Sequence, residues 1–489
     1  MTRKAPRSVS IALAAAVVSA SLSARAQDSA TPREAGSPPI ETPSTPPDAT
    51  TNASDDKTFS ALLDTRLGFG GLDEDFYLSL NIGAAFRWWK LGVGVQAPLR
   101  FRVIDRSPKQ KEVFRKQDWD EPSDWTRILR YISWGAPGEW IYGRIGVLTG
   151  VTLGNGTLVD RYYNTIDADH FQTGLSFELN LDGGGTGLFL DNLLDPEMAG
   201  VRGYVQPFAF GDFGALAKAF QVGFTLVIDG AAPMQPVLDS TQSRQLDGSS
   251  NLRVQTEPLV FLGFDLAWQV QPTDWVVVRP YTDFNVWTQT GGLGYHLGLL
   301  ATFDIAGAVT LGTRVEYRAL SADYSPSWVN SWYEVERLDF LPDPVTGRQL
   351  TKARYFRDRH VRGQDEIRHG WHWSLDLTIL DAVTVSGIFE DYQGEDNANL
   401  MLRLALPYIA GVKLSAYYAK RNFEGIENAF DLDRGLLVAE ARYKFWGPMA
   451  VFARYSREWR IERDRAATNF GEYETIDDWD VGIGAEFTF

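Results

Sequence analysis

The sequence predicts an all-β fold, a transmembrane antiparallel up-and-down β-barrel built from residues 58–489. Three observations predict it. Residues 481–489 alternate apolar with small or polar side chains and end in an aromatic residue. The same alternation recurs along most of the chain, as expected where one face of a strand meets lipid and the other meets water. Tryptophans gather near the ends of these runs, where aromatic girdles hold a barrel at the membrane interfaces.

The amino terminus predicts export. Two arginines and a lysine precede an apolar run at 11–18 and a small-residue stretch that ends at Ala26. This pattern is typical of a cleavable secretory signal, so residues 1–26 are predicted to be removed. The apolar run is too short for a transmembrane helix, which needs about twenty apolar residues. Residues 27–57 are rich in Pro and Thr and predict a disordered periplasmic leader.

Composition narrows the class of protein further. The mean hydropathy is only −0.21 although the chain holds 28 Phe, 19 Tyr and 16 Trp. Strand alternation explains this, because every lipid-facing residue is followed by a lumen-facing one. With no cysteine there is neither a disulfide framework nor thiolate chemistry. The net charge is −16 and becomes more negative once the basic signal is lost, so nucleic acid is not an expected partner.

The alternating runs define about twenty strands, or about eighteen if the weak hairpin at 182–187 does not form. The clearest runs are residues 76–88, 91–103, 140–151, 259–271, 275–288, 293–305, 309–319, 371–380, 383–391, 400–408, 412–421, 436–446, 449–460 and 479–489. Weaker runs lie at 59–68, 126–135, 171–181, 188–194, 201–210 and 220–229.

The connections between these runs alternate in length, as they do in barrels with periplasmic turns and external loops. Tight turns rich in turn-forming residues are predicted at 89–90, 136–139, 271–274, 306–307, 381–382, 409–411 and 447–448. Long polar connections are predicted at 105–125, 154–169, 230–258, 323–370, 422–434 and 461–478. The longest, 323–370, carries many charges of both signs. Two placements stay open for it: inside the lumen as a constriction, or over the mouth as a lid.

Strand parity places many charged residues on inward positions. The candidate lumen-lining residues are Arg87, Arg100, Arg102, Arg144, Arg279, Asp283, Arg314, Glu316, Arg318, Asp376, Arg403, Glu440, Arg442 and Arg454. Facing lipid instead would cost about 2–4 kcal/mol for a midplane Arg, so a hydrated lumen is predicted. Two interpretations stay open: the charges pair across neighbouring strands and stiffen the wall, or the arginines form a ladder along a solute path.

The sequence does not predict an enzyme, a cofactor or a metal site. It has no G-x-S-x-G elbow and no H-E-x-x-H motif. The cluster of two acids and a histidine at 167–170 is read as a solvated external loop. His369 and His372 would point to opposite faces of one strand, which disfavours a shared ligand.

The terminal residues 486–489 resemble the carboxy termini of Gram-negative outer-membrane β-barrels. This resemblance implies that Phe487 and Phe489 form an assembly signal read by the barrel-assembly machinery. It also implies a bacterial outer-membrane location, in contact with lipid and lipopolysaccharide. The predicted function is a porin-like channel for hydrophilic solutes, with the oligomeric state left open. The chain is also similar in size and lumen charge to exopolysaccharide-export barrels, which is one alternative. A surface or structural barrel without conduction is the other.

Overall fold

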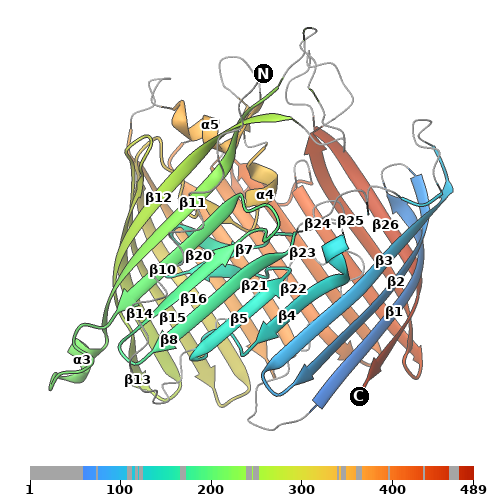
Figure 1. Ribbon diagram of the computed structural model, residues 1–489, viewed down its shortest axis with the longest axis horizontal. Coiled ribbons are helices and arrows are strands. Elements are labelled where there is room, and N and C mark those ends of the chain that lie inside the picture. Colours follow the sequence, from blue (N-terminus) through green and yellow to red (C-terminus); the bar gives the residue numbers. More distant parts are fainter. Residues whose placement is uncertain are drawn as a thin grey trace.

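The computed structural model forms one closed antiparallel β-barrel of twenty wall strands (Figure 1). It describes residues 59–461 and 473–489 apart from segments at 73–74, 107–112, 116–118, 120–124, 166–171, 238–239, 241–244, 246–252, 339–340, 343–348, 360–365, 381, 395–396 and 433–434. The predicted signal peptide, the leader and the cluster at 167–170 all lie outside the described residues. Among the described residues, no helix is long and apolar enough to cross a membrane.

The wall strands follow one another around the barrel in sequence order. Their bounds are β1 (Phe59–Leu72), β2 (Asp75–Trp88), β3 (Leu91–Ile104), β4 (Leu129–Trp134), β5 (Ile141–Gly146), β8 (Gly174–Leu181), β9 (Gly184–Leu190), β10 (Met198–Val205), β11 (Phe220–Pro236), β12 (Val254–Trp268), β13 (Val270–Thr273), β14 (Val276–Trp287), β15 (Gly292–Ile305), β16 (Val309–Leu320), β20 (Arg368–Ile379), β21 (Val383–Tyr392), β22 (Ala398–Ile409), β23 (Val412–Phe423), β24 (Gly435–Trp446), β25 (Met449–Ile461) and β26 (Tyr473–Thr488). β12 and β13 both pair with β14 and form two parts of one wall strand.

The first and last strands close the barrel. β1 pairs with β26 from Leu62 opposite Thr488 to Gly71 opposite Trp479. Beyond this ladder, the Ala61 amide donates to the Phe489 carbonyl at 3.0 Å, and the Phe489 amide donates to the Ala61 carbonyl at 2.9 Å. Pairing of the first strand with the last is what a membrane requires, because unpaired backbone groups at an open sheet edge are costly in hydrocarbon.

The two faces of the wall differ as the alternation predicts. On β2 the outward residues Leu78, Ile82 and Phe86 are exposed, whereas the intervening Asn81 and Ala85 are buried. Exposed tryptophans border the short connections at one end of the barrel; they are Trp88, Trp89, Trp134, Trp140, Trp268, Trp275 and Trp446. This is the position of an interfacial aromatic girdle.

The predicted strand runs and the alternation of short and long connections are both confirmed. The weak hairpin forms too, since β8 and β9 are joined by residues 182–183. Several predicted boundaries were wrong; β10 ends at Val205 and not at 210, and β26 begins at Tyr473 and not at 479. β11 and β12 continue their ladder past the predicted ends, to Pro236 and from Val254, through register shifts after Asp229 that let the hairpin rise beyond the wall.

The predicted strand at 140–151 was also too long. β5 ends at Gly146, whose φ of +125° turns the chain away from the wall. A Cβ there would lie 2.3 Å from the Arg130 carbonyl oxygen, so this turn requires glycine. The chain then enters the barrel instead of forming the external loop predicted at 154–169.

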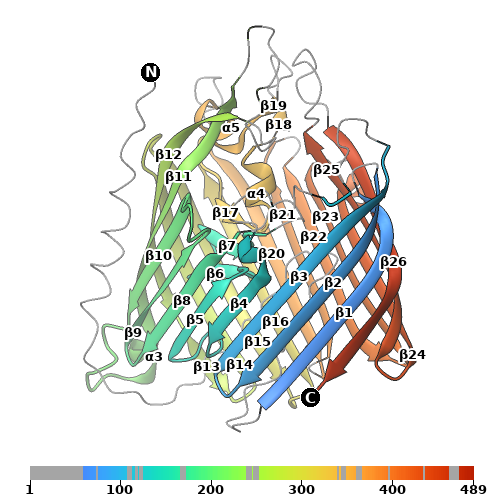
Figure 2. The same ribbon diagram turned by 45° about the vertical axis from the view of Figure 1, so that its right-hand side comes forward.

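Inside the barrel lies a small separate sheet (Figure 2). β6 (Val151–Leu153) and β7 (Val159–Tyr162) pair antiparallel, and β17 (Val329–Asn330) joins β7 in parallel. After β17 follow α4 (Tyr333–Glu336), a two-stranded hairpin of β18 (Leu341–Pro342) and β19 (Gln349–Leu350), and α5 (Lys352–Arg357), which packs on β11. We call residues 147–165 and 321–338 the inner insert. Part of the long 323–370 connection thus enters the barrel and part stays near its mouth.

Candidate functional site: the inner insert and its wall

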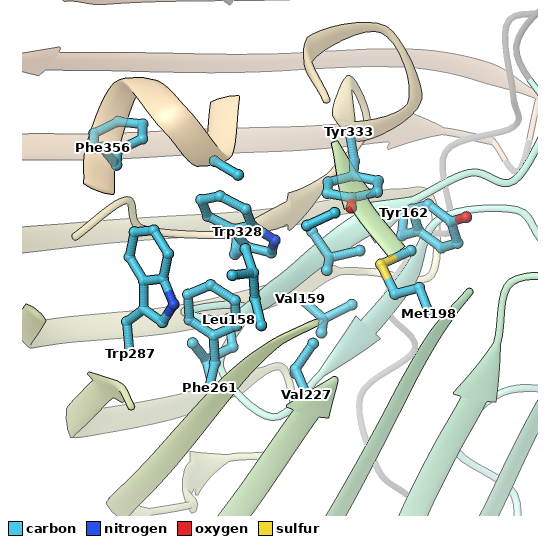
Figure 3. Close-up of a cluster of buried hydrophobic side chains, with 14 of the residues drawn as sticks. Leu158, Val159, Tyr162, Met198, Val227, Phe261, Trp287, Trp328, Tyr333 and Phe356 are labelled. Atoms are coloured by element: carbon cyan, nitrogen blue, oxygen red, sulfur yellow. The ribbon is translucent and has the colours of Figure 1, made fainter. Parts of the chain in front are cut away.

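An apolar core fixes the inner insert to one side of the wall (Figure 3). Trp328 of the insert stacks on Phe261 of β12 with ring centroids 4.8 Å apart and packs 5.5 Å from Trp287 of β14. Leu158 and Val159 of the insert belong to the same buried cluster. All five side chains are at most 2% exposed. Their burial stabilises the insert in place, at about 1.5–3 kcal/mol for each large apolar side chain.

Next to this core, polar side chains of the wall hold both segments of the inner insert. The Asp283 carboxylate on β14 accepts hydrogen bonds from Asn155 Nδ2 at 2.8 Å and from Thr157 Oγ1 at 2.5 Å. Asp229 on β11 accepts from Trp328 Nε1 at 3.3 Å and from the Tyr333 hydroxyl. Buried carboxylates in such sites are stabilised only by donors placed around them, so the insert and wall depend on each other.

Arg314 on β16 links the wall to the insert by charge. Its guanidinium donates to the Asn155 carbonyl oxygen at 2.7 Å and pairs with Asp160 of β7. Gly156 lies directly against it at a φ of +80°, so a side chain there would both strain the backbone and displace the arginine. On the other side of β7, Arg161 pairs with Asp376 of β20 at 2.6 Å.

A second polar network lies within the wall beside Arg314. Glu316 accepts from Arg318 and Tyr281, and lies 3.0 Å from His296 Nδ1. Glu390 on β21 extends the network, since it pairs with Arg318 at 2.9 Å. Its other contacts are His372 Nδ1 at 2.7 Å and Asn399 Nδ2 at 3.3 Å. His372 is buried whereas His369 is exposed, so the two point to opposite faces as predicted.

The second half of the inner insert and α5 are joined by a buried ion triad. Glu336 pairs with Lys352 of α5 at 3.0 Å and with Arg421 of β23 at 2.6 Å. Burial raises the pKa of Glu336, but the two cations outweigh burial and hold the pKa below its ordinary value. Burial lowers the pKa of Lys352, and Glu336 offsets part of this effect. Lys352 also donates to the Trp328 carbonyl oxygen at 2.9 Å.

Across the barrel, the inner face near the closing strands carries a separate lattice of charges. Arg66 on β1 pairs with Asp64 at 2.9 Å and with Glu440 of β24 at 3.4 Å. Arg442 pairs with Glu440 and lies 3.8 Å from both Asp64 and Glu486 of β26. These contacts reach across the strands between β24 and β1, because side chains converge on the concave face of a closed wall.

A pocket lies between the inner insert and strands β20–β23. It is lined by Asp160, Ser327, Asn330, Ser331 and Trp332 from the insert and by His372, Ile388, Glu390, Asn399, Leu400, Met401 and Arg421 from the wall. Charged, amide, hydroxyl and apolar groups are mixed there, so the surface suits a hydrated solute more than an apolar one.

The candidate lumen residues fall into three groups. Arg314, Asp283 and Asp376 contact the inner insert, and Glu316 and Arg318 belong to the network beside it. Glu440 and Arg442 belong to the lattice near the closing strands. The others lie elsewhere on the wall; buried among them are Arg100, Arg102, Arg144 and Arg454, and partly exposed are Arg87, Arg279 and Arg403. A role of these residues along a solute path stays a prediction.

Sequence reasoning missed the groups that the inner insert and α5 supply. Asn155, Asp160 and Arg161 lie in a segment without strand alternation, and Lys352 lies in a helix of six residues. The only local signal in the sequence is the glycine pair at 154 and 156. In the structure both glycines have positive φ angles, which mark a tight reversal and not an extended loop. Among the described residues, no three His, Asp or Glu side chains form a group that could hold a metal ion.

The fold and these two faces define the class of the protein. A closed twenty-strand barrel with an apolar outer face and a charged inner face is a bacterial outer-membrane β-barrel. No protein-family model matches the chain, and the search of curated proteins gave no match.

Solved structures with a similar architecture include two proteins of Pseudomonas aeruginosa and a receptor. OccK11 (OpdR) is 10% identical, with 88% of this chain and 96% of that chain covered and a TM-score of 0.33. OpdK with vanillate is 10% identical, with 88% and 99% covered and a TM-score of 0.31. The ferric enterobactin receptor PfeA is 9% identical, with 89% and 82% covered and a TM-score of 0.33. Likeness at this level is confined to general barrel architecture and does not identify a solute.

Proposed function

We propose that this protein is a porin-like channel that passes hydrophilic solutes through its lumen, beside the inner insert. One observation carries the proposal: two connections distant in sequence enter the barrel and are clamped to its inner face by Asp283, Arg314 and Trp328. An inward-folded segment narrows a lumen and thereby sets which solutes pass. The charged side chains around it keep the remaining space polar.

Two interpretations of the inner arginines were left open: pairing that stiffens the wall, and a ladder along a solute path. The partners of these arginines in the structure bear on this choice. Arg66, Arg314, Arg318 and Arg442 each pair with carboxylates, so their charges are largely compensated. This supports a structural role for these four, in which they stiffen the wall and hold the inner insert. We therefore expect weak ion selectivity, and we expect the inner insert to limit the size of the solutes that pass.

The test is conduction by the protein without its signal peptide, refolded into a planar lipid bilayer. Discrete conductance steps with a reversal potential near zero in a salt gradient are expected. A barrel that inserts and folds, shown by a gel mobility that changes when the sample is heated, yet conducts nothing would contradict the proposal. That outcome would favour a structural barrel or a gated exporter instead.

A further inference from the structure

The connection between β10 and β11 differs from the other short connections of the barrel. Residues 206–219, here named the α3 loop, contain the short helix α3 (Ala215–Lys218) and protrude at the lower left of Figure 1. Three large apolar side chains of this loop are strongly exposed: Phe210 at 75%, Phe213 at 49% and Leu216 at 72%. Three such side chains so close together in a short loop form an apolar surface that water disfavours.

Backbone hydrogen bonds fix the α3 loop to both neighbouring turns. The Gln206 amide donates to the Gly183 carbonyl in the β8–β9 turn at 2.7 Å. At the other end of the loop, the Gln269 amide beside β12 donates to the Ala219 carbonyl at 3.1 Å. The exposed side chains are therefore presented from a position tied to the rim of the barrel.

A chain of aromatic contacts joins the α3 loop to the outer face of the wall. Phe213 and Phe208 have ring centroids 5.1 Å apart, and Phe208 lies 6.1 Å from Phe220 at the start of β11. Phe220 in turn packs 4.7 Å from Trp268 of β12. Phe220 has the same strand parity as the outward Phe224, which is 51% exposed. The rings thus run without a break from the lipid-facing wall into the loop.

Trp268 and the nearby Trp275 belong to the exposed tryptophans that border the short connections. Amphipathic rings at this position lie at the level of the lipid headgroups. Lys218 is exposed at the end of α3 and can reach phosphate oxygens while its stem covers apolar surface.

We propose that the α3 loop is a lipid-binding element, which inserts Phe210, Phe213 and Leu216 into the phospholipid layer at the short-connection end of the barrel. The observation behind it is continuity: the loop extends the apolar outer face, which lipid covers in any membrane barrel. The proposal depends on the barrel spanning a membrane and is independent of whether the barrel conducts.

The absence of cysteine allows a clean test with single spin labels. Leu216→Cys and Phe213→Cys are labelled with a nitroxide, and the full protein is reconstituted in phosphatidylethanolamine–phosphatidylglycerol vesicles. Collision with oxygen, which concentrates in lipid, is compared with collision with a water-soluble nickel chelate. Leu297→Cys, outward on β15 and 53% exposed, gives the lipid reference. Asp274→Cys, in an exposed neighbouring turn, gives the water reference.

The expected result is an oxygen-to-nickel ratio at both loop positions shifted from the Asp274→Cys value toward the Leu297→Cys value. A ratio equal to that of Asp274→Cys would overturn the proposal, because the loop would then lie in water. Exclusion of both reagents would also overturn it, since protein would then cover the loop. Spin–spin broadening in that case would identify a second copy of the chain as the cover. A gel mobility that changes on heating checks that each variant is folded.

Discussion

At the scale of single residues, charge pairing inside the barrel joins segments that are far apart in sequence. Arg314 contacts Asn155 and Asp160, which precede it by more than 150 residues. Arg314 and Asp160 are both buried. Removing one partner of such a pair leaves an uncompensated charge, which costs more than an exposed pair contributes.

The variant Arg314→Gln should loosen the inner insert. We expect a local destabilisation of about 3–5 kcal/mol, because Asp160 is left buried without its cation. Single-channel recordings should show a larger conductance and a noisier open state, with little change in ion selectivity.

The partly exposed pair of Arg354 and Asp358, 3.2 Å apart near the mouth, supplies the control Arg354→Gln. The double variant Arg314→Gln/Asp160→Asn removes both charges of the pair. If its conductance is again as low and as quiet as that of the wild type, the result would support the pairing of Arg314 with Asp160. A large shift in reversal potential in Arg314→Gln at unchanged conductance would instead favour the arginine ladder.

Glu336 makes the attachment of α5 sensitive to acid. Its pKa is lower in the folded protein than its ordinary value of 4.5, because Arg421 and Lys352 stabilise the carboxylate. The resulting stability is fully present above that ordinary pKa and is lost as the pH falls below it. In single-channel recordings, closures or noise that depend on the contact of Glu336 with Lys352 and Arg421 should therefore increase at acid pH.

Glu336→Gln should produce the same behaviour at neutral pH, since it removes the charge and keeps the shape. Hydrogen exchange of residues 349–357 provides a second readout. Asp358→Asn is the matched control, because Asp358 lies outside the buried triad. An identical pH response in wild type and Glu336→Gln would show that another group titrates.

At the scale of elements, the inner insert contains little regular secondary structure and is held in place by packing. β6, β7 and β17 have three, four and two residues, too few to be stable as a sheet on their own. Trp328 supplies the central contact, since it stacks on Phe261 and packs beside Trp287.

Trp328→Ala should release the insert without opening the wall. The cavity it leaves should cost about 3–5 kcal/mol locally. Amides of β7 and β17 should exchange with solvent faster, while those of the wall strands should stay protected. Trp371→Ala, on the outer face and 59% exposed, is the control. If amides throughout the barrel lost protection from exchange equally, the insert and the wall would unfold together, which would contradict the prediction.

At the scale of the whole molecule, the carboxy terminus completes the barrel. Phe489 exchanges both backbone hydrogen bonds with Ala61, and its ring stacks 6.5 Å from Phe487 on the outer face. The residue thus has a backbone role in closure in addition to its predicted role as an assembly signal.

The two roles of Phe489 can be separated. Phe489→Ala keeps the backbone hydrogen bonds, so refolding of the purified chain into lipid should be nearly unchanged. The amount of assembled barrel in cells should nevertheless fall if the ring is the signal. Deleting Phe489 should lower both. Measuring the fraction whose gel mobility changes on heating gives both results, and normal assembly of Phe489→Ala in cells would rule out the ring as a signal.

The sequence by itself determined the wall. Strand alternation, turn residues and the aromatic run ends predicted the barrel, its strand count and the hairpin at 182–187, because each of these is set by neighbours within a few residues or by the lipid around the molecule. Inward parity also selected Arg314, Asp283 and Asp376. Only the tertiary structure decided what these residues contact. The insert segment at 147–165 has no regular pattern in the sequence. Its position inside the barrel follows from the burial of Trp328 and the pairing of Asp160, and both require contacts between residues that are far apart in the sequence.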